Sequence, residues 1–209
     1  MKKIQHVCSL GFNCHASYFL KTNGLKKESY PFDWIMSNLI VVEQCLKDNF
    51  VNYLDKKLYI SNSPDSKCGH KLYCHNMFAH HNPMTNDEHY SYFVRCVSRF
   101  RTLLASSESK LFIISIINGE HDIGININND IKKKFVDFNT FLQTQTVNYT
   151  LLIIVNYPNK KANNFKLTTC GNLVLLELTT LSTNSGSQYL NATDNTYLNS
   201  LFKQMFIFV

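Results

Sequence analysis

Glycine and proline are scarce in this chain, with 7 and 4 residues respectively among 209. Because these two residue types interrupt helices and strands, their scarcity predicts long regular elements. No stretch reaches the roughly 20 apolar residues that a membrane-spanning helix needs, so no membrane span is predicted. Hydrophobic residues make up 44% of the chain and charged residues 17%, which excludes an intrinsically disordered chain and indicates a globular protein.

Clustered basic residues are also lacking, although the net charge is +6. The longest run of lysines covers only residues 132–134, and the other basic residues are scattered. Proteins that bind nucleic acids normally concentrate basic residues on one face, often together with stacking aromatic rings. We therefore predict no nucleic-acid partner. The charge permits an acidic ligand without indicating one.

The seven cysteines are odd in number and irregularly spaced, and no uninterrupted apolar segment typical of a secretory signal follows the basic start. These features predict free thiols and a cytoplasmic location. One segment gathers side chains that can bind zinc but lacks the paired spacing of a zinc finger. We therefore predict no metal site and no cofactor. The side chains concerned are Cys68, His70, Cys74, His75, His80 and His81.

Apolar segments rich in β-branched residues alternate with amphipathic segments along the chain. Strands are predicted at residues 4–10, 110–117, 149–157 and 172–178, and helices at 14–25, 38–50, 85–107, 130–145 and 192–206. Thr85 and Glu88 form a capping-box pattern that predicts the start of the third helix. Continuous apolar strands separated by helices are typical of a parallel sheet covered on both faces.

These elements predict one α/β domain that covers residues 1–209. Its expected architecture is a three-layer α/β/α sandwich, Rossmann-like or esterase-like, with a mostly parallel sheet of about four to five strands. In such sheets ligands bind outside the carboxyl ends of the strands. Residues that directly follow a predicted strand are therefore the first candidates for a functional site.

The segment SLGFNC, residues 9–14, places a glycine-containing turn between the first predicted strand and the first predicted helix. A thiol at a helix N-terminus can have a lowered pKa, and the amides of such a turn can hold an oxyanion. Cys14 is therefore a candidate nucleophile. The alternative is a packed, inert thiol, because free cysteine is also a small buried hydrophobe.

A cysteine nucleophile needs a base, which is usually histidine. His15 is a poor choice because neighbouring residues on a helix point in different directions. His80 and His81 lie in the long irregular segment 59–86, which we expect to pack over the carboxyl edge of the sheet. The alternative is that both are solvated loop histidines. Asp33, in the aromatic segment YPFDW, is expected either to orient the base or to cap a turn.

The opening of the chain resembles that of a family of papain-like cysteine peptidases. The family pattern S-L-G-x-x-C, followed by P-F-D-W, matches residues 9–14 and 31–34. Its F-x-H and R-x-x-x-R-F elements are similar to residues 78–80 and 95–100, and a late aspartate of the family is similar to Asp194. The first of these patterns is the most specific.

The resemblance implies a cysteine-dependent hydrolase, either a peptidase or an acyl-transfer enzyme. It implies Cys14 as the nucleophile, His80 as the base and Asp33 as a candidate for the orienting group. The substrate is a peptide, an ester or a carbohydrate, and the sequence does not distinguish these. The predicted substrate contacts are Gly11, Asn13, Trp34, His81, Arg95 and Arg99.

Two other classes of function fit the same pattern. A carbohydrate or nucleotide-sugar handling domain, similar to a glycosyltransferase, would bind phosphate at the strand–turn–helix junction and hold anionic groups with Arg95 and Arg99. A non-catalytic module would keep the fold and bind a protein partner. The separation of the Cys14 sulfur from the His80 ring distinguishes the hydrolase from these alternatives.

Overall fold

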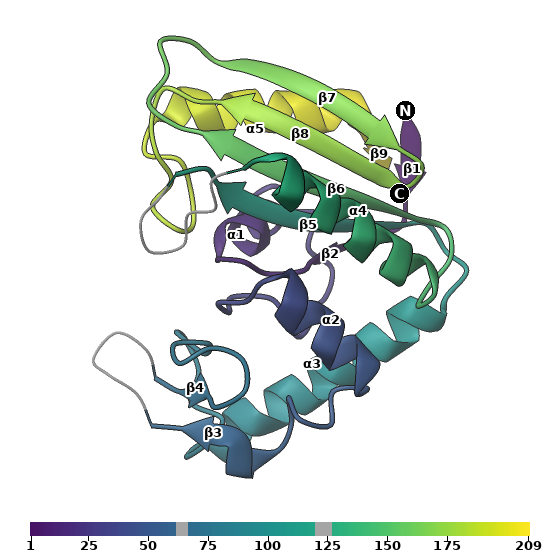
Figure 1. Cartoon of the computed structure of the whole chain (residues 1–209), viewed down its shortest axis with the longest axis vertical. Helices are drawn as coiled ribbons and strands as arrows, with labels where there is room; N and C mark the ends of the chain where they lie inside the picture. The colour runs from purple at the N-terminus through teal and green to yellow at the C-terminus, as the bar shows by residue number, and fades with distance from the viewer. Residues whose placement is uncertain (62–66, 120–126) are drawn as a thin grey trace.

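A five-stranded sheet with the strand order β2-β5-β6-β8-β7 forms the centre of the protein (Figure 1). The computed structural model describes residues 1–61, 67–119 and 127–209. Four strands run parallel, and β7 is antiparallel to β8. Their bounds are β2 His6–Ser9, β5 Lys110–Ile117, β6 Tyr149–Tyr157, β7 Asn164–Cys170 and β8 Leu173–Thr179. The predicted α/β class with a mostly parallel sheet is confirmed.

Five α-helices lie within the described residues, close to the five predicted positions. They are α1 His15–Thr22, α2 Leu39–Lys47, α3 Asp87–Ala105, α4 Asn129–Gln143 and α5 Ala192–Met205. The capping-box prediction for α3 was wrong, because the helix is capped by the next residue. The side chain of Asn86 accepts hydrogen bonds from the amides of Glu88 and His89. None of the helices in the described ranges has both the length and the apolar character that a membrane crossing requires.

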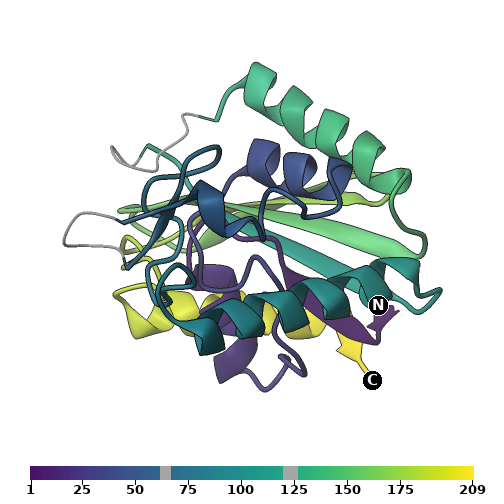
Figure 2. The same ribbon diagram turned by 90° about the horizontal axis from the view of Figure 1, so that it is seen from below.

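Helices pack on both faces of the sheet and bury its apolar strands. On one face, Phe112 and Ile153 belong to a core cluster with residues of α2, α3 and α4. On the other face, Ile113 and Ile154 belong to a cluster with residues of α1 and α5. Figure 2 shows the sheet between α2 and α4 on one side and α1 and α5 on the other. Burial of both faces explains why β5 and β6 are apolar along nearly their whole length.

Several strands are absent from the sequence prediction, and β7 shows most clearly why. All seven residues of β7 are exposed, so NFKLTTC gives no burial pattern from which a strand could be predicted. The predicted first strand divides into β1, Lys2–Ile4, and β2, and β1 pairs with β9, Phe206–Phe208, at the chain's end. The short strands β3, Tyr59–Ile60, and β4, Gly69–His70, pair after the 3₁₀ turn η1, Lys56–Leu58.

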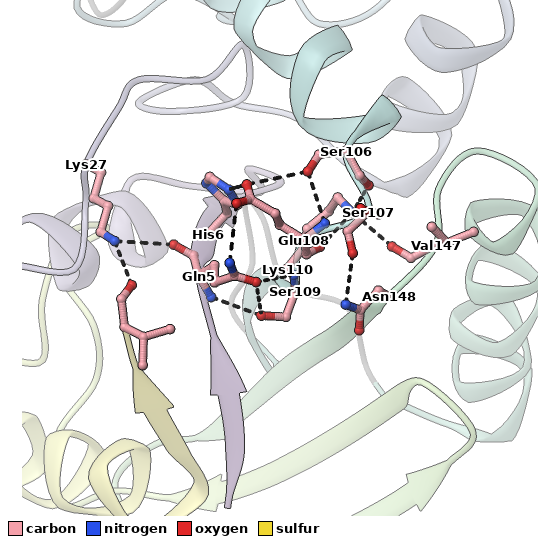
Figure 3. A network of polar contacts seen from close by, with 11 residues as sticks. Gln5, His6, Lys27, Ser106, Ser107, Glu108, Ser109, Lys110, Val147 and Asn148 are labelled. Carbon is pink, nitrogen blue, oxygen red and sulfur yellow. Dashed lines mark hydrogen bonds and ion pairs between the residues drawn. The ribbon is translucent and has the colours of Figure 1, made fainter.

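A polar network ties β2 to β5 at the amino edge of the sheet (Figure 3). The buried Lys110 ammonium donates hydrogen bonds of 2.6–2.9 Å to the carbonyls of Ser106, Glu108 and Val147. Burial lowers the pKa of Lys110, and the nearby Glu108 carboxylate opposes this. The Gln5 side-chain oxygen accepts hydrogen bonds from the Ser109 amide and hydroxyl, and the Gln5 backbone amide donates one to the Ser109 hydroxyl. These contacts fix the register of β2, whose other end carries the SLGFNC turn.

Candidate functional site

The turn after β2 has a backbone that requires glycine. Gly11 has φ +86°, and a Cβ added there would lie 2.0 Å from the Ser37 hydroxyl oxygen. That hydroxyl accepts a hydrogen bond from the Phe12 amide at 3.1 Å and donates one to the Leu10 carbonyl at 3.3 Å. Phe12 also has a positive φ of 79°. Ser37 therefore closes the turn at a point where no side chain of residue 11 fits.

The residues around the turn direct the chain into α1. The Ser9 hydroxyl accepts a hydrogen bond from the Gly11 amide at 3.2 Å. The buried Asn13 accepts one from the His15 amide through Oδ1 at 3.0 Å, which satisfies a free N–H group at the start of the helix. Gly11 and Asn13 were predicted as substrate contacts. Their observed contacts build the turn, and their contact with substrate stays a prediction.

Cys14 and His80 come together at the carboxyl edge of the sheet. The Cys14 Sγ lies 3.4 Å from the His80 Nε2, although 66 positions separate the two residues in the sequence. Cys14 is the N-cap residue of α1 and is partly buried, and His80 is exposed in the segment before α3. The later part of segment 59–86 thus reaches this edge at His80; residues 62–66 of that segment lie outside the described residues.

The protonation state of Cys14 differs from the expectation. Burial raises the pKa of its thiol above the ordinary value. The expectation that the helix N-terminus lowers this pKa was wrong in direction, because partial removal from water disfavours the thiolate. A protonated thiol beside an imidazole is therefore the resting state at neutral pH.

Trp34 forms the wall of the site next to His80. The two rings make an edge-on contact with centroids 6.2 Å apart and planes at 89°. The ammonium groups of Lys21 and Lys26 lie 5.8 and 5.4 Å from the indole centroid. Trp34 has φ +60°, a conformation that is uncommon for a bulky residue. Backbone strain of this kind persists where the surroundings enforce it, often beside a functional site.

Asp33 is buried beneath the turn that presents Trp34. Its carboxylate accepts hydrogen bonds of 2.8 Å from the Ser17 hydroxyl and from the Tyr30 amide. Lys26 forms an ion pair with the same carboxylate at 2.7 Å. In the described part of the chain, no histidine is among its hydrogen-bond or ion-pair partners. These contacts support a positioning role that joins α1 to the PFDW turn.

Asp33→Asn is expected to lower stability and to leave Cys14 chemistry nearly unchanged. The substitution keeps the shape of the side chain but leaves the Lys26 ammonium, only 12% exposed, without its counter-charge. We expect a loss of about 3 kcal/mol, since breaking a buried ion pair on one side is costly. Thermal unfolding and the rate of Cys14 alkylation measure the two effects. Adding Lys26→Met to Asp33→Asn removes both charges and should recover part of the stability; a large fall in alkylation at unchanged stability would instead make Asp33 an orienting group.

His81 and His15 contact side chains other than Cys14, so His80 is the histidine beside the thiol. The His81 ring stacks on Tyr92 with centroids 4.8 Å apart, and burial, with the nearby His89, His80 and Lys67, lowers its pKa to about 4. The buried His15 ring contacts the Ser115 hydroxyl at 2.7 Å. Burial lowers the pKa of His15 to about 4 as well. Both imidazoles are therefore neutral at physiological pH.

The remaining predicted residues lie on α3 and at the start of α5. Arg95 and Arg99 are both exposed on α3, and Arg99 faces Glu28 at 4.0 Å. Asp194 is buried at the start of α5, where it accepts hydrogen bonds from Asn163, Leu181 and Ser182. Although burial alone would raise its pKa, these bonds lower it. No group of three or more potential metal ligands occurs in residues 1–61, 67–119 or 127–209.

Three residues that build the site were missed in the sequence. Ser37, Ser17 and Lys26 act through contacts with residues 7 to 27 positions away. None belongs to a recognisable spacing pattern. A serine that bridges two backbone groups gives no signal in a single sequence. The sequence analysis identified the glycine-containing turn but not the close approach of Ser37 to Gly11.

The fold is of the α/β class, and the site is centred on a thiol and an imidazole. Residues 5–156 match the family described as putative papain-like cysteine peptidase (DUF1796), and the chain belongs to this family. The resemblance inferred from the opening motif is confirmed. Comparison with curated proteins and with solved structures gave no match.

Proposed function

We propose that the protein is a cysteine hydrolase in which Cys14 is the nucleophile and His80 is the general base. The observation that carries this proposal is the 3.4 Å contact between the Cys14 Sγ and the His80 Nε2. A nucleophile within reach of a base, at the edge of a parallel sheet where ligands bind, is the arrangement that acyl transfer needs. Membership of the peptidase family supports the same chemistry.

The other cysteines support the choice of Cys14. Cys8 is completely buried, and burial raises its pKa well above the ordinary value. Burial also raises the pKa of Cys45 to about 12 and that of Cys96 to about 11. Cys170 is exposed, but it lies on the edge strand β7. Cys14 thus combines partial exposure with an adjacent imidazole, which makes it the best-placed nucleophile.

Catalysis begins from a protonated Cys14 thiol, since burial raises its pKa. As the Cys14 Sγ attacks a carbonyl carbon, the His80 Nε2 takes the thiol proton, and a tetrahedral oxyanion forms. His80 then gives this proton to the leaving amine or alcohol, whose bond to the carbonyl carbon breaks and leaves a thioester. His80 then takes a proton from water as the water attacks the thioester. The acid is released, and His80 returns the proton from water to the Cys14 sulfur, which restores the thiol.

The amides of the turn are the proposed donors to the oxyanion. The amides of Gly11 and Phe12 are already bonded to Ser9 and Ser37. Within the described ranges, those of Asn13 and Cys14 make no such bond. These two N–H groups at the start of α1 are therefore assigned to the developing negative charge. The turn has little freedom to adjust, because it is held in position by the Ser37 hydroxyl.

The proposal also covers the layer arrangement of the fold and the cellular compartment of the protein. Core clusters on both faces of the sheet support a single domain over residues 1–209 with a three-layer α/β/α arrangement of Rossmann-like or esterase-like type. All seven cysteines are free, which fits a reducing compartment such as the cytoplasm. The carbohydrate-related and non-catalytic alternatives stay predictions without a specific contact in their favour.

A hydrolysis screen tests the proposed function. Fluorogenic peptides and esters are incubated with the wild type, with Cys14→Ala and with Cys170→Ala as the matched control. We expect hydrolysis that Cys14→Ala lowers by at least about 10³-fold, the usual size of a nucleophile deletion, and that Cys170→Ala retains. Hydrolysis that survives in Cys14→Ala, in a variant that melts like the wild type, would remove Cys14 from the mechanism.

A further inference from the structure

A cationic cleft lies beside the proposed catalytic pair. It has a volume of about 480 Å³, and it lies at the C-terminal half of α1 and the following loop, with a contribution from α3. The lining residues are Lys21, Lys26, Lys27, Glu28, Ser29, Trp34 and Arg99.

Positive charge exceeds negative charge in this cleft. Four cationic side chains line it, against Glu28 in its wall and Asp33 beneath, so two positive charges are in excess. Lys26 forms an ion pair with Asp33, and Lys27 donates a hydrogen bond of 2.7 Å to the backbone oxygen of Val209.

Lys21 and Arg99 are the cations with the least compensation. Lys21 is exposed and contacts the Trp34 ring. Arg99 lies 4.0 Å from Glu28, which is a long ion pair between exposed groups. These two side chains can therefore turn to a ligand without breaking a strong contact.

Trp34 connects the cleft to the catalytic pair. The same indole ring that lines the cleft makes the edge-on contact with His80. Its strained backbone is fixed by the adjacent Asp33, which is bonded to Ser17 and Tyr30. A substrate whose carbonyl carbon lies at Cys14 can therefore pass across the indole and place a neighbouring group in the cleft.

We propose that this cleft is a specificity subsite for an anionic side chain of a peptide substrate. The inference rests on the proposed function, because the position of the subsite is defined relative to a substrate carbonyl carbon bound at Cys14. The shared chemistry is an anionic oxygen group, either the carboxylate of a glutamate or aspartate or the phosphate of a phosphoserine. Lys21 and Arg99 bind it, and Trp34 packs against the stem of the side chain.

Alkylating peptides test the subsite directly. Iodoacetyl peptides ending in glutamate amide, glutamine amide or phosphoserine amide, with no, one or two glycine spacers, are reacted with the wild type. The rate of Cys14 labelling is followed by mass spectrometry. At one spacer length we expect the glutamate probe to label Cys14 about tenfold faster than the isosteric glutamine probe. The phosphoserine arm shows which anion fits better.

Substitution in the cleft identifies the groups responsible. We expect Lys21→Gln to reduce the glutamate-to-glutamine rate ratio from about tenfold to about twofold. Lys203→Gln, an exposed lysine on α5, makes the same change in net charge and should keep the wild-type ratio. An equal fall of the rate ratio in both variants would overturn the subsite, because the ratio would then depend only on the overall charge of the protein.

The two proposals fail in different ways. If Cys14 is labelled readily but the three probes react at equal rates at every spacer length, the subsite is wrong and the nucleophile stands. If no probe labels Cys14 faster than the buried Cys45, the proposed function itself fails, and the subsite fails with it.

Discussion

His80→Gln is expected to lower kcat/KM for hydrolysis by about 10³-fold, within the range of general-base catalysis. The thiol of Cys14 is protonated at neutral pH because burial raises its pKa, so attack depends on a base that removes the proton. Glutamine keeps a polar side chain of similar reach but accepts no proton at neutral pH. Steady-state kinetics with a substrate from the hydrolysis screen measure the loss.

His75→Gln is the matched control for this variant. His75 is an exposed histidine of the same segment, and it should show the wild-type kcat/KM. Thermal unfolding of His80→Gln checks that the segment is still folded. A loss of less than about threefold in His80→Gln, with the midpoint unchanged, would contradict a base at this position, since even weak base catalysis contributes more.

Gly11→Ala is expected to reduce the free energy of unfolding by about 3 kcal/mol and the melting temperature by about 9 °C. The new Cβ would lie 2.0 Å from the Ser37 Oγ, and the residue would keep a positive φ of 86°. Ser37 must then move, and its hydrogen bonds with Phe12 and Leu10 break. Chemical denaturation gives the free energy, and calorimetry gives the midpoint.

Gly24→Ala separates the two causes of this loss. Gly24 also has a positive φ, of 67°, but a Cβ there meets nothing within 4 Å. Its substitution should cost only about 1 kcal/mol, the conformational part alone. Ser37→Ala added to Gly11→Ala removes the clashing oxygen and should recover part of the stability. Equal losses of unfolding free energy in Gly11→Ala and Gly24→Ala would show that the close approach of Ser37 does not contribute to the loss.

The fold follows from local patterns that the sequence displays. Buried strands such as β5 and β6 appear as apolar runs, and α3 shows its apolar face at helical spacing. The edge strand β7 could not be predicted, because exposed strands carry no burial signal and pair only through the backbone. The division of the first strand at Gln5 depends on the chain's last residues, which no local window contains.

The site was predictable only in part, for a related reason. The strand–turn–helix pattern placed Cys14 at the carboxyl edge, and the family resemblance selected His80. The partners of Asp33 depend on long-range packing, so the sequence could not show that Lys26 and Ser17 engage its carboxylate. The predicted direction of the Cys14 pKa shift was wrong for the same reason, since burial is a property of the folded chain.

The most direct test is the pH dependence of Cys14 alkylation by iodoacetamide, in the wild type and in His80→Gln. If the two residues act as a pair, the wild-type rate shows a second inflection besides the alkaline one of the thiol, because the two groups titrate together. His80→Gln should lose this inflection and react only as the thiol ionises at alkaline pH, because burial raises the pKa of Cys14. Superimposable profiles with one alkaline inflection would contradict the Cys14–His80 pair.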